Sequence, residues 1–275
     1  MAGICTFFST RGALWKAAVL LPLMAGLGGA GERSAGSPDA GRTPILMELF
    51  TSEGCSSCPP VDNWLARMDA AQPLAGAEII VLSEHVDYWD HDGWKDPFSS
   101  AAMTERQKQY VFNLGLRTIY TPQIILDGNA ELRPSEPERA KQILAKAANA
   151  PTIAVHINSV TVSAGSPAAL DGHIEADSGT QSHGEVFVAV ALDKVLTDVL
   201  GGENNGRKLT NIAVVRKIVR IGKLEKGRRF DQTFSIRLWP DADPANLRVV
   251  AFVQEPGPGR VLGAAMTKEI TRAGN

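Results

Sequence analysis

The stretch ILMELFTSEGCSSCPP, residues 45–60, decides the fold of this 275-residue chain. Its first six residues, up to Phe50, are apolar apart from Glu48, which predicts a strand buried on both faces. A tight turn with the motif Cys55-Ser56-Ser57-Cys58 follows. The two prolines after the motif suit the first turn of a helix, where a missing amide hydrogen costs little. The sequence therefore predicts a strand, a turn with two cysteines and a helix.

The N-terminus has the features of a signal peptide. Arg11 and Lys16 precede an apolar run at residues 17–25, and small residues follow up to Ala30. A positive start, an apolar run and a small cleavage site occur in that order in exported precursors, and the run is shorter than the ~18 apolar residues of a spanning helix. We expect residues 1–30 to be removed, leaving a protein in the bacterial periplasm or secreted, with no stable membrane span.

Cleavage changes the cysteine count and the charge. It removes Cys5, so that Cys55 and Cys58 are the two cysteines that remain. The net charge changes from −2 to about −4. Neither value suggests a nucleic-acid partner. Residues 207–229 form a basic stretch, which we interpret as a solvated face, with an anionic partner in the cell envelope as the alternative.

The pattern of apolar residues divides the mature chain in two. After a flexible Gly/Ser/Pro-rich linker at residues 31–43, residues 44–150 alternate in the order β-α-β-α-β-β-α, which predicts an α/β domain. From residue 151 to 275, short β-branched stretches between turn residues predict an all-β, sandwich-like domain. The strands expected in that second domain include residues 153–157, 170–176, 186–192, 212–221, 230–238 and 248–253.

The position of the cysteines suggests redox chemistry. A thiolate at a helix N-terminus faces unpaired amide hydrogens and the positive end of the helix dipole, which lowers the pKa of Cys55. A thiol with a lowered pKa attacks disulfides, and Cys58, one turn deeper, can then resolve the mixed disulfide. We therefore interpret Cys55 as the attacking thiol and Cys58 as the resolving thiol. The alternative is a permanent disulfide, although closing so short a loop gains little chain entropy.

The order of the motifs resembles the thioredoxin superfamily. A buried strand, a Cys-x-x-Cys motif that begins a helix, and Thr121-Pro122 before a later strand are the constellation of that superfamily. The resemblance implies a thioredoxin-like domain at residues 44–150, followed by the all-β domain, and a cis peptide bond at Pro122. It also implies that Pro122 lies beside the sulfurs and that Thr121 offers backbone groups to a bound peptide.

Longer motifs resemble an uncharacterised family of secreted thioredoxin-like proteins. The family implies a fold and a location, while its biochemical activity is unassigned. Gly54 stands where thioredoxin has a tryptophan and Pro59 replaces a lysine, so partners of the cytosolic reductase type are not implied. The motifs are ELFTSEGCSSCPP at residues 48–60, HVDYWD at 85–90 and GWKDPF at 93–98, with further likeness at 117–128 and 202–207.

Two further features suggest site residues. Glu48 lies in a strand expected to be buried, where an unpaired carboxylate is costly. We expect it to shuttle the proton of Cys58, with pairing to a surface base as the alternative. The aromatic stretch 84–96 leaves the second strand on the side of the cysteines, so we expect Trp89 and Trp94 to form an apolar wall for a client peptide. The alternative is that this loop packs its own aromatic residues as a small core.

Metal binding is an alternative use of the cysteines. Thiolate and imidazole ligands suit copper(I) or zinc, so Cys55 and Cys58 with His85 or His91 form an alternative soft-metal site. The sequence lacks the tight ligand spacing of a closed zinc site. It indicates no role for the remaining histidines, which are His156, His173 and His183.

Together these features predict an exported thiol-disulfide oxidoreductase or redox-dependent binder with no cofactor beyond the Cys55-Cys58 disulfide. Its partners would be an exported protein or thiol substrate and a redox partner of unknown identity. The alternatives are a copper(I)-binding carrier and a non-catalytic envelope binding module with a structural disulfide. The direction of electron flow, the oligomeric state and the task of the β domain do not follow from the sequence.

Overall fold

The computed structural model describes residues 41–165, 167–178 and 183–273. The predicted signal peptide and the predicted linker up to residue 40 lie outside the described residues. Thr43, the last residue of that linker, already belongs to the first strand. In the described part of the chain, no helix is both long and apolar enough to span a membrane.

The order of elements up to residue 148 is the predicted one, and all six strands expected after residue 151 are present. The first part contains β1 (Thr43–Thr51), α1 (Pro59–Ala71), β2 (Ala77–His85), α2 (Ala101–Asn113), β3 (Gln123–Leu126), β4 (Ala130–Leu132) and α3 (Pro137–Ala148). The second part contains β5 (Val155–Ser163), β6 (Ala169–Asp177), β7 (Gly184–Asp198), β8 (Lys208–Leu224), β9 (Arg229–Arg237), η1 (Pro244–Asn246), β10 (Leu247–Gln254), β11 (Val261–Thr267) and β12 (Thr271–Arg272).

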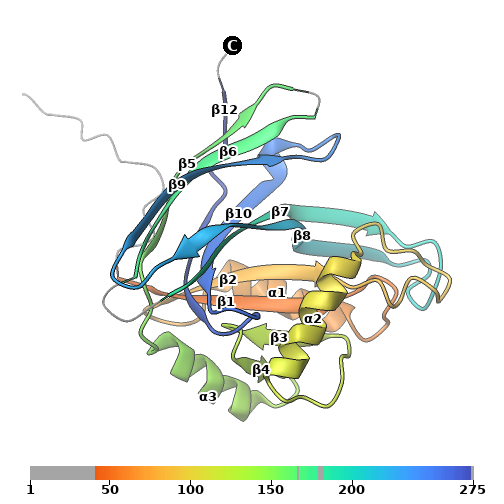
Figure 1. Cartoon of the computed structure of the whole chain (residues 1–275). Helices are drawn as coiled ribbons and strands as arrows, with labels where there is room; N and C mark the ends of the chain where they lie inside the picture. The colour runs from red at the N-terminus through yellow and green to blue at the C-terminus, as the bar shows by residue number, and fades with distance from the viewer. Residues whose placement is uncertain (1–40, 166, 179–182, 274–275) are drawn as a thin grey trace, which may run out of the picture. The chain divides into compact units, whose positions relative to one another are not determined.

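The strands form two mixed sheets, and this arrangement corrects the expected fold class. The larger sheet has the order β11-β10-β7-β8-β2-β1-β3-β4, so strands from both halves of the chain share it (Figure 1). Strands β2 and β8 run parallel and meet at Ser83 and Val214. The prediction of an α/β thioredoxin-like domain followed by a β-sandwich is therefore wrong, because the described chain is mainly β and its halves share a sheet. Whether residues 44–150 and 151–275 fold as separate units stays a prediction.

Side chains from both halves also share a hydrophobic core. Leu46 of β1 and Ile80 of β2 pack in one cluster with Ala189 of β7 and with Val250 and Phe252 of β10. Burial of this apolar surface stabilises the fold by roughly 25 cal/mol per Å². The first half therefore completes its core only with strands that come more than a hundred residues later in the chain.

A buried arginine adds a polar link between the halves. Arg248 of β10 is only 1% exposed, and its guanidinium donates to both carboxylate oxygens of Asp69 in α1, at 2.9 and 2.8 Å. It also donates to Asp193 of β7 at 2.7 Å. A bidentate arginine–carboxylate pair of this kind fixes the orientation of α1 as well as its distance from the sheet.

The smaller sheet has the order β12-β5-β6-β9. It packs on the face of β7 and β10 that points away from the core cluster around Leu46 and Ile80. Leu170 and Ile174 of β6 point inward to a core that includes Val188 and Val249. Because side chains alternate along a strand, Asp171, His173 and Glu175 of β6 point outward. The outer face of this sheet is thus polar.

Helices α1 and α2 lie on opposite faces of β1 and β2 (Figure 1). Leu49 of β1 packs with Leu65 of α1, whereas Leu46 packs with Met103 of α2. Glu48 therefore faces α2, while Leu49 faces α1. The two faces of β1 and β2 therefore carry different polar groups. The cysteines belong to the face that α1 covers.

The basic stretch 207–229 lies on β8 and at the start of β9, and several of its cations pair with carboxylates. These pairs are exposed, as expected for a solvated face. Exposed ion pairs contribute little to stability. The pairs are Lys208 with Asp198 at 3.1 Å, Arg220 with Glu185 at 2.9 Å and Arg228 with Glu225 at 2.6 Å.

Candidate functional site

The two cysteines lie at the start of α1, as the sequence predicted. Cys58 is the N-cap residue, and its carbonyl oxygen accepts hydrogen bonds from the amides of Val61 at 2.8 Å and Asp62 at 3.0 Å. Its own amide donates to the Cys55 carbonyl at 3.2 Å. Both cysteines are free thiols in the structure. The turn therefore presents a dithiol at the positive end of a helix.

The surroundings of Cys55 favour its thiolate. The Cys58 thiol donates to it and is the largest influence, and the Ser57 hydroxyl lies 3.1 Å from the sulfur. These interactions outweigh burial, which opposes ionisation, and they lower the pKa of Cys55 to about 6. At neutral pH Cys55 is thus mainly the nucleophilic thiolate.

The surroundings of Cys58 do the opposite. Burial, followed by the hydrogen bond to Cys55, raises the pKa of Cys58 well above that of an ordinary thiol. Asp62 adds a negative charge nearby and raises it further. Cys58 therefore keeps its proton until a base removes it, and the two thiols have clearly different roles.

Asp62 is a carboxylate connected to the cysteine pair through the Thr51 hydroxyl. Its Oδ1 accepts a hydrogen bond from the Thr51 hydroxyl at 2.8 Å, and Thr51 also lies within hydrogen-bonding reach of the Cys58 sulfur. Burial raises the pKa of Asp62 to about 7, while the positive charge of His85 opposes this rise. A carboxylate with a pKa near neutral can accept and return a proton under physiological conditions.

A second set of buried polar groups lies next to Asp62. His85 is 1% exposed, and its Nδ1 lies 2.7 Å from Asp96 Oδ2. Burial disfavours the charged imidazolium, but Asp96, Asp62 and Glu53 together raise the pKa of His85. The other ring nitrogen, Nε2, is buried and has no hydrogen-bond partner. Glu53 is held by Asn211 Nδ2 at 2.8 Å, and burial raises its pKa.

The loop between β7 and β8 holds the cysteine turn from the other half of the chain. Asn204 is fully buried, and its Nδ2 donates to the carbonyl oxygens of Glu53 at 2.8 Å and Cys55 at 2.9 Å. Glu203 Oε2 accepts from the amide of Ser56 at 2.9 Å. The stretch 202–207, which the family motifs include, therefore contacts the cysteine turn.

The β7–β8 loop also lies very close to the aromatic loop at residues 84–96. A Cβ on Gly201 would lie 2.2 Å from the carbonyl oxygen of Gly93 in the aromatic loop. Any other residue at position 201 would therefore push the two loops apart.

The predicted aromatic and proline residues gather at the same place. The bond between Thr121 and Pro122 is cis, and the Thr121 carbonyl oxygen lies 3.9 Å from the Cys55 sulfur. Trp89 Nε1 donates to Thr121 Oγ1 at 2.7 Å, and Trp94 Nε1 donates to Glu53 Oε2 at 3.2 Å. Both tryptophans are partly buried, and their role in holding a client stays a prediction.

Glu48 lies on the α2 face and contacts other residues than the cysteines. Its Oε1 accepts from Arg106 Nε at 2.8 Å, and its Oε2 accepts from the Tyr110 hydroxyl at 2.5 Å. Glu84, also buried, lies 3.6 Å from Arg106 Nε. The structure thus pairs Glu48 with Arg106, a base that is itself largely buried and not at the surface as the alternative expected, and brings Asp62 to Cys58.

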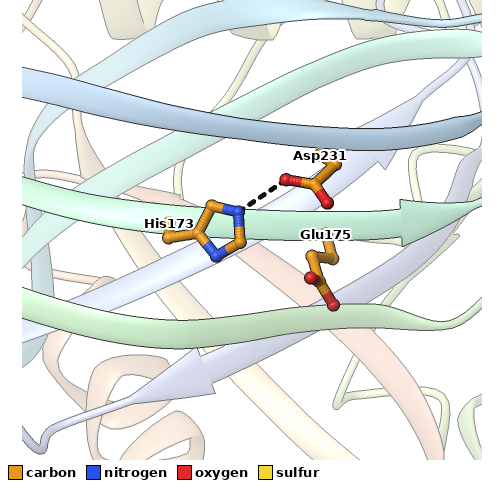
Figure 2. Close-up of side chains that lie close together, drawn as sticks. All are labelled: His173, Glu175 and Asp231. Carbon is orange, nitrogen blue, oxygen red and sulfur yellow. Dashed lines mark hydrogen bonds and ion pairs between the residues drawn. The ribbon is translucent and has the colours of Figure 1, made fainter.

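The structure does not gather the cysteines and histidines into a metal-ligand set. His91 is exposed, while His85 is buried beside Asp96. Among the described residues, only the ligand atoms of His173, Glu175 and Asp231 lie within 4.8 Å of one another (Figure 2). This group is on the smaller sheet, and the sequence analysis had given His173 no role.

Access to Cys55 is closed in the structure. Its side chain is 0% exposed, although the neighbouring Ser56 and Ser57 are exposed. The Thr121 carbonyl oxygen lies near the Cys55 sulfur, and the β7–β8 loop contacts the backbone carbonyl of Cys55. An incoming disulfide therefore reaches the sulfur only after a movement that uncovers it.

Fold and site together define a β-rich protein with a shared eight-stranded sheet and a buried dithiol at a helix N-terminus. The chain belongs to the family described as Protein of unknown function (DUF1223), which matches residues 46–254. This supports the resemblance to an uncharacterised family that the long motifs suggested.

Among solved structures, the chain is similar to protein AGR_C_4864 from Agrobacterium tumefaciens, known from an X-ray crystal structure. The two share 26% sequence identity with a TM-score of 0.62, over 82% of this chain and 94% of that chain. A β-glucosidase from Listeria innocua shares 13% identity with a TM-score of 0.23, over 43% of this chain and 16% of that chain, and this weak likeness carries no argument. A comparison with curated proteins finds no match.

Sequence reasoning missed three parts of the site. Asp62 had a usable signal, because residues four apart lie on the same side of a helix and Asp62 is the fourth residue after Cys58. Thr51 follows from Asp62, since it ends the strand beside it. Asn204 and Glu203 had none, because their contacts join residues about 150 positions apart.

Proposed function

We propose that the protein is an exported thiol-disulfide oxidoreductase in which Cys55 attacks and Cys58 resolves. The observation that carries the proposal is the difference between the two thiols. The same turn lowers the pKa of Cys55 to about 6 and raises that of Cys58. A structural disulfide needs no such difference, whereas exchange needs one thiolate and one protected thiol.

In the reducing direction, the Cys55 thiolate attacks one sulfur of a client disulfide. A mixed disulfide forms, and the first client thiolate leaves. The Cys58 sulfur, after losing its proton, attacks Cys55 and releases the second client thiolate. The protein then holds a Cys55–Cys58 disulfide, and an external dithiol must return two electrons before the next turnover. Run backward, the same steps oxidise a client dithiol.

Asp62 is the group that we propose to take the proton from Cys58. Its carboxylate is connected to that thiol through the Thr51 hydroxyl. Its pKa of about 7 means that it is partly ionised at neutral pH and can accept a proton. Asp62 thus takes the role that the sequence analysis expected for Glu48.

The arrangement of the site resembles that of the thioredoxin superfamily at the level of local chemistry. A cysteine pair at a helix start lies beside a cis X-Pro bond, with Thr121 oxygen 3.9 Å from the Cys55 sulfur. This supports Thr121 and Pro122 as the backbone surface for a client peptide, with Trp89 and Trp94 beside it. Because Cys55 is covered, we also propose that the client displaces the β7–β8 loop around Asn204.

The test is the reduction potential of the Cys55/Cys58 pair in the full chain carrying Cys5→Ser, measured against glutathione mixtures. We expect a value within the range of known exchangers, about −270 to −120 mV, and the value would show whether the protein reduces or oxidises its clients. A pair that stays oxidised below about −300 mV would be a structural disulfide and would end this proposal.

A trapping experiment tests the order of the thiols. The Cys58→Ala variant should accumulate a mixed disulfide at Cys55 when mixed with glutathione disulfide, as measured by mass spectrometry. The matched Cys55→Ala variant should remain unmodified at Cys58. Equal trapping by both variants would contradict the assigned roles.

A further inference from the structure

The outer face of the smaller sheet carries a group of side chains that suits a metal ion. On β6, Ile174 points into the core, while His173 and Glu175 on either side of it point outward. Asp231 of β9 is directly opposite Glu175 in the antiparallel register, so both lie on the same face. Figure 2 shows the three side chains close together, with the hydrogen bond between His173 and Asp231.

The ligand atoms are already close. His173 Nε2 lies 2.7 Å from Asp231 Oδ1, and one atom each from His173, Glu175 and Asp231 lie within 4.8 Å of one another. Atoms bound to a zinc ion at about 2.0–2.2 Å are on the order of 3–3.5 Å apart. Small side-chain rotations therefore convert the present contacts into a coordination set.

The charges favour a cation at this position. Two carboxylates directly opposite each other across neighbouring strands repel. At present Glu175 accepts a hydrogen bond from Asn158 and pairs with Arg229, whose guanidinium lies 2.5 Å from Glu175 Oε2, while Asp231 is hydrogen-bonded to His173. Arg229 is 56% exposed, so it can leave Glu175 for solvent at little cost when a metal ion replaces its charge.

Another histidine lies on the next strand, on the same face. His156 of β5 is directly opposite Glu175 on its other side, and its neighbour Val155 points into the core. His156 therefore belongs to the outer face as well. The row His156, Glu175 and Asp231 crosses three adjacent strands, with His173 beside it.

We infer that His173, Glu175 and Asp231, with His156 as fourth ligand, form a binding site for a divalent transition-metal ion of the Zn²⁺ class. Imidazole nitrogens together with carboxylate oxygens are ligands that Zn²⁺ accepts in tetrahedral sites. The bound ion would join the central strands β5 and β6 to the edge strand β9. This site is separate from the cysteine pair and does not depend on the proposed redox function.

The test is a titration of the full chain with Zn²⁺ in competition with a chromogenic chelator. The chain carries Cys5→Ser, Cys55→Ser and Cys58→Ser, so that thiolates cannot bind the ion and a failure of the redox proposal cannot affect the result. We expect one equivalent of Zn²⁺ to bind. The His173→Ala and Asp231→Asn variants should each bind roughly tenfold or more weakly.

Three further variants sharpen the result. His183→Ala removes an exposed histidine outside the group and should leave the affinity unchanged. Arg229→Gln removes the competing cation and should tighten binding. His156→Ala should weaken binding while keeping one equivalent.

Two outcomes would overturn the inference. The first is that Zn²⁺ does not bind. The second is binding that His173→Ala and Asp231→Asn leave unchanged. Circular dichroism of each variant establishes that it is folded, and the substituted residues of the proposed site lie on the outer face of the smaller sheet.

Discussion

On the two faces of the sheet at β1 and β2, the buried Glu48 and the partly buried Asp62 are held in different ways. On the α2 face, Glu48 is fully buried and receives a guanidinium from Arg106 and a hydroxyl from Tyr110. On the α1 face, Asp62 receives the Thr51 hydroxyl, and His85 is the positive charge that acts on it. Glu48 is thus held in a structural ion pair, whereas burial raises the pKa of Asp62, which has no guanidinium partner among the described residues, to about 7, where it can accept and return a proton.

The α2 face should be the more sensitive to loss of its cation. Arg106→Met leaves Glu48 buried without its charge partner, next to Glu84, whose pKa burial and Glu48 already raise. We expect the free energy of unfolding to fall by about 3–5 kcal/mol, as measured by urea denaturation at pH 7.

The control for this prediction lies on the same helix. Lys108 forms an exposed pair with Glu105 at 3.7 Å, so Lys108→Met should change the unfolding free energy by less than about 0.5 kcal/mol. Equal effects of the two substitutions would show that the Glu48 cluster is not the structural element described above.

On the α1 face, a substitution should change the rate at which Cys58 resolves the mixed disulfide. Asp62→Asn removes the proton acceptor while keeping the side-chain shape, so Cys58 is deprotonated more slowly. We expect the release of a mixed disulfide from Cys55 to slow roughly 10- to 100-fold, with the first attack by Cys55 little changed. Stopped-flow measurement of both steps with a small disulfide separates them, and Glu48→Gln provides the comparison from the other face. If Glu48→Gln slows resolution and Asp62→Asn does not, the assignment of the proton acceptor is wrong.

The same substitution should change stability in a pH-dependent way. Burial raises the pKa of Asp62 to about 7, so the folded state holds this proton more tightly than the unfolded state does. That contribution is present at low pH and is lost as the pH rises from about 4 through 7. Asp62→Asn should therefore be more stable than the parent by up to about 4 kcal/mol at pH 8, since each pKa unit corresponds to about 1.4 kcal/mol, and equally stable below pH 4. A constant difference across this range, in thermal or urea unfolding, would contradict the raised pKa.

The smallest effect should come from the loop that covers the α1 face. Asn204→Ala removes the two hydrogen bonds to the carbonyl oxygens of Glu53 and Cys55, at a cost of about 1–3 kcal/mol to local closure. Cys55 should then react faster with iodoacetamide at pH 7, while Asn205→Ala, one residue later, should not change the rate. An unchanged rate for Asn204→Ala would mean that another segment controls access.

The local order of structure was predictable from the sequence, because it depends on residues close in the chain. The apolar run before the cysteines, the prolines after Cys58 and the turn residues at Asp127-Gly128 predict strand, helix and turn where they occur. Even Asp62 could have been found, since it lies one helical turn beyond Cys58.

The shared sheet was not predictable in the same way. Its two halves meet through the single pair Ser83 and Val214, and short apolar runs do not indicate which strand will be their neighbour. The same limit applies to Asn204 at the cysteine turn and to Asp231 opposite Glu175, because each depends on a register between distant segments.

The central claim is that the turn ionises Cys55 and protects Cys58. The most direct measurement is the thiolate absorbance at 240 nm of the reduced full chain with Cys5→Ser, titrated from pH 4 to 9 and compared with the same chain carrying Cys55→Ser. We expect one thiolate with a midpoint near pH 6, absent from the Cys55→Ser chain, and no second thiolate below pH 9. Two thiolates that both appear above about pH 8.5, where free cysteines ionise, would contradict it.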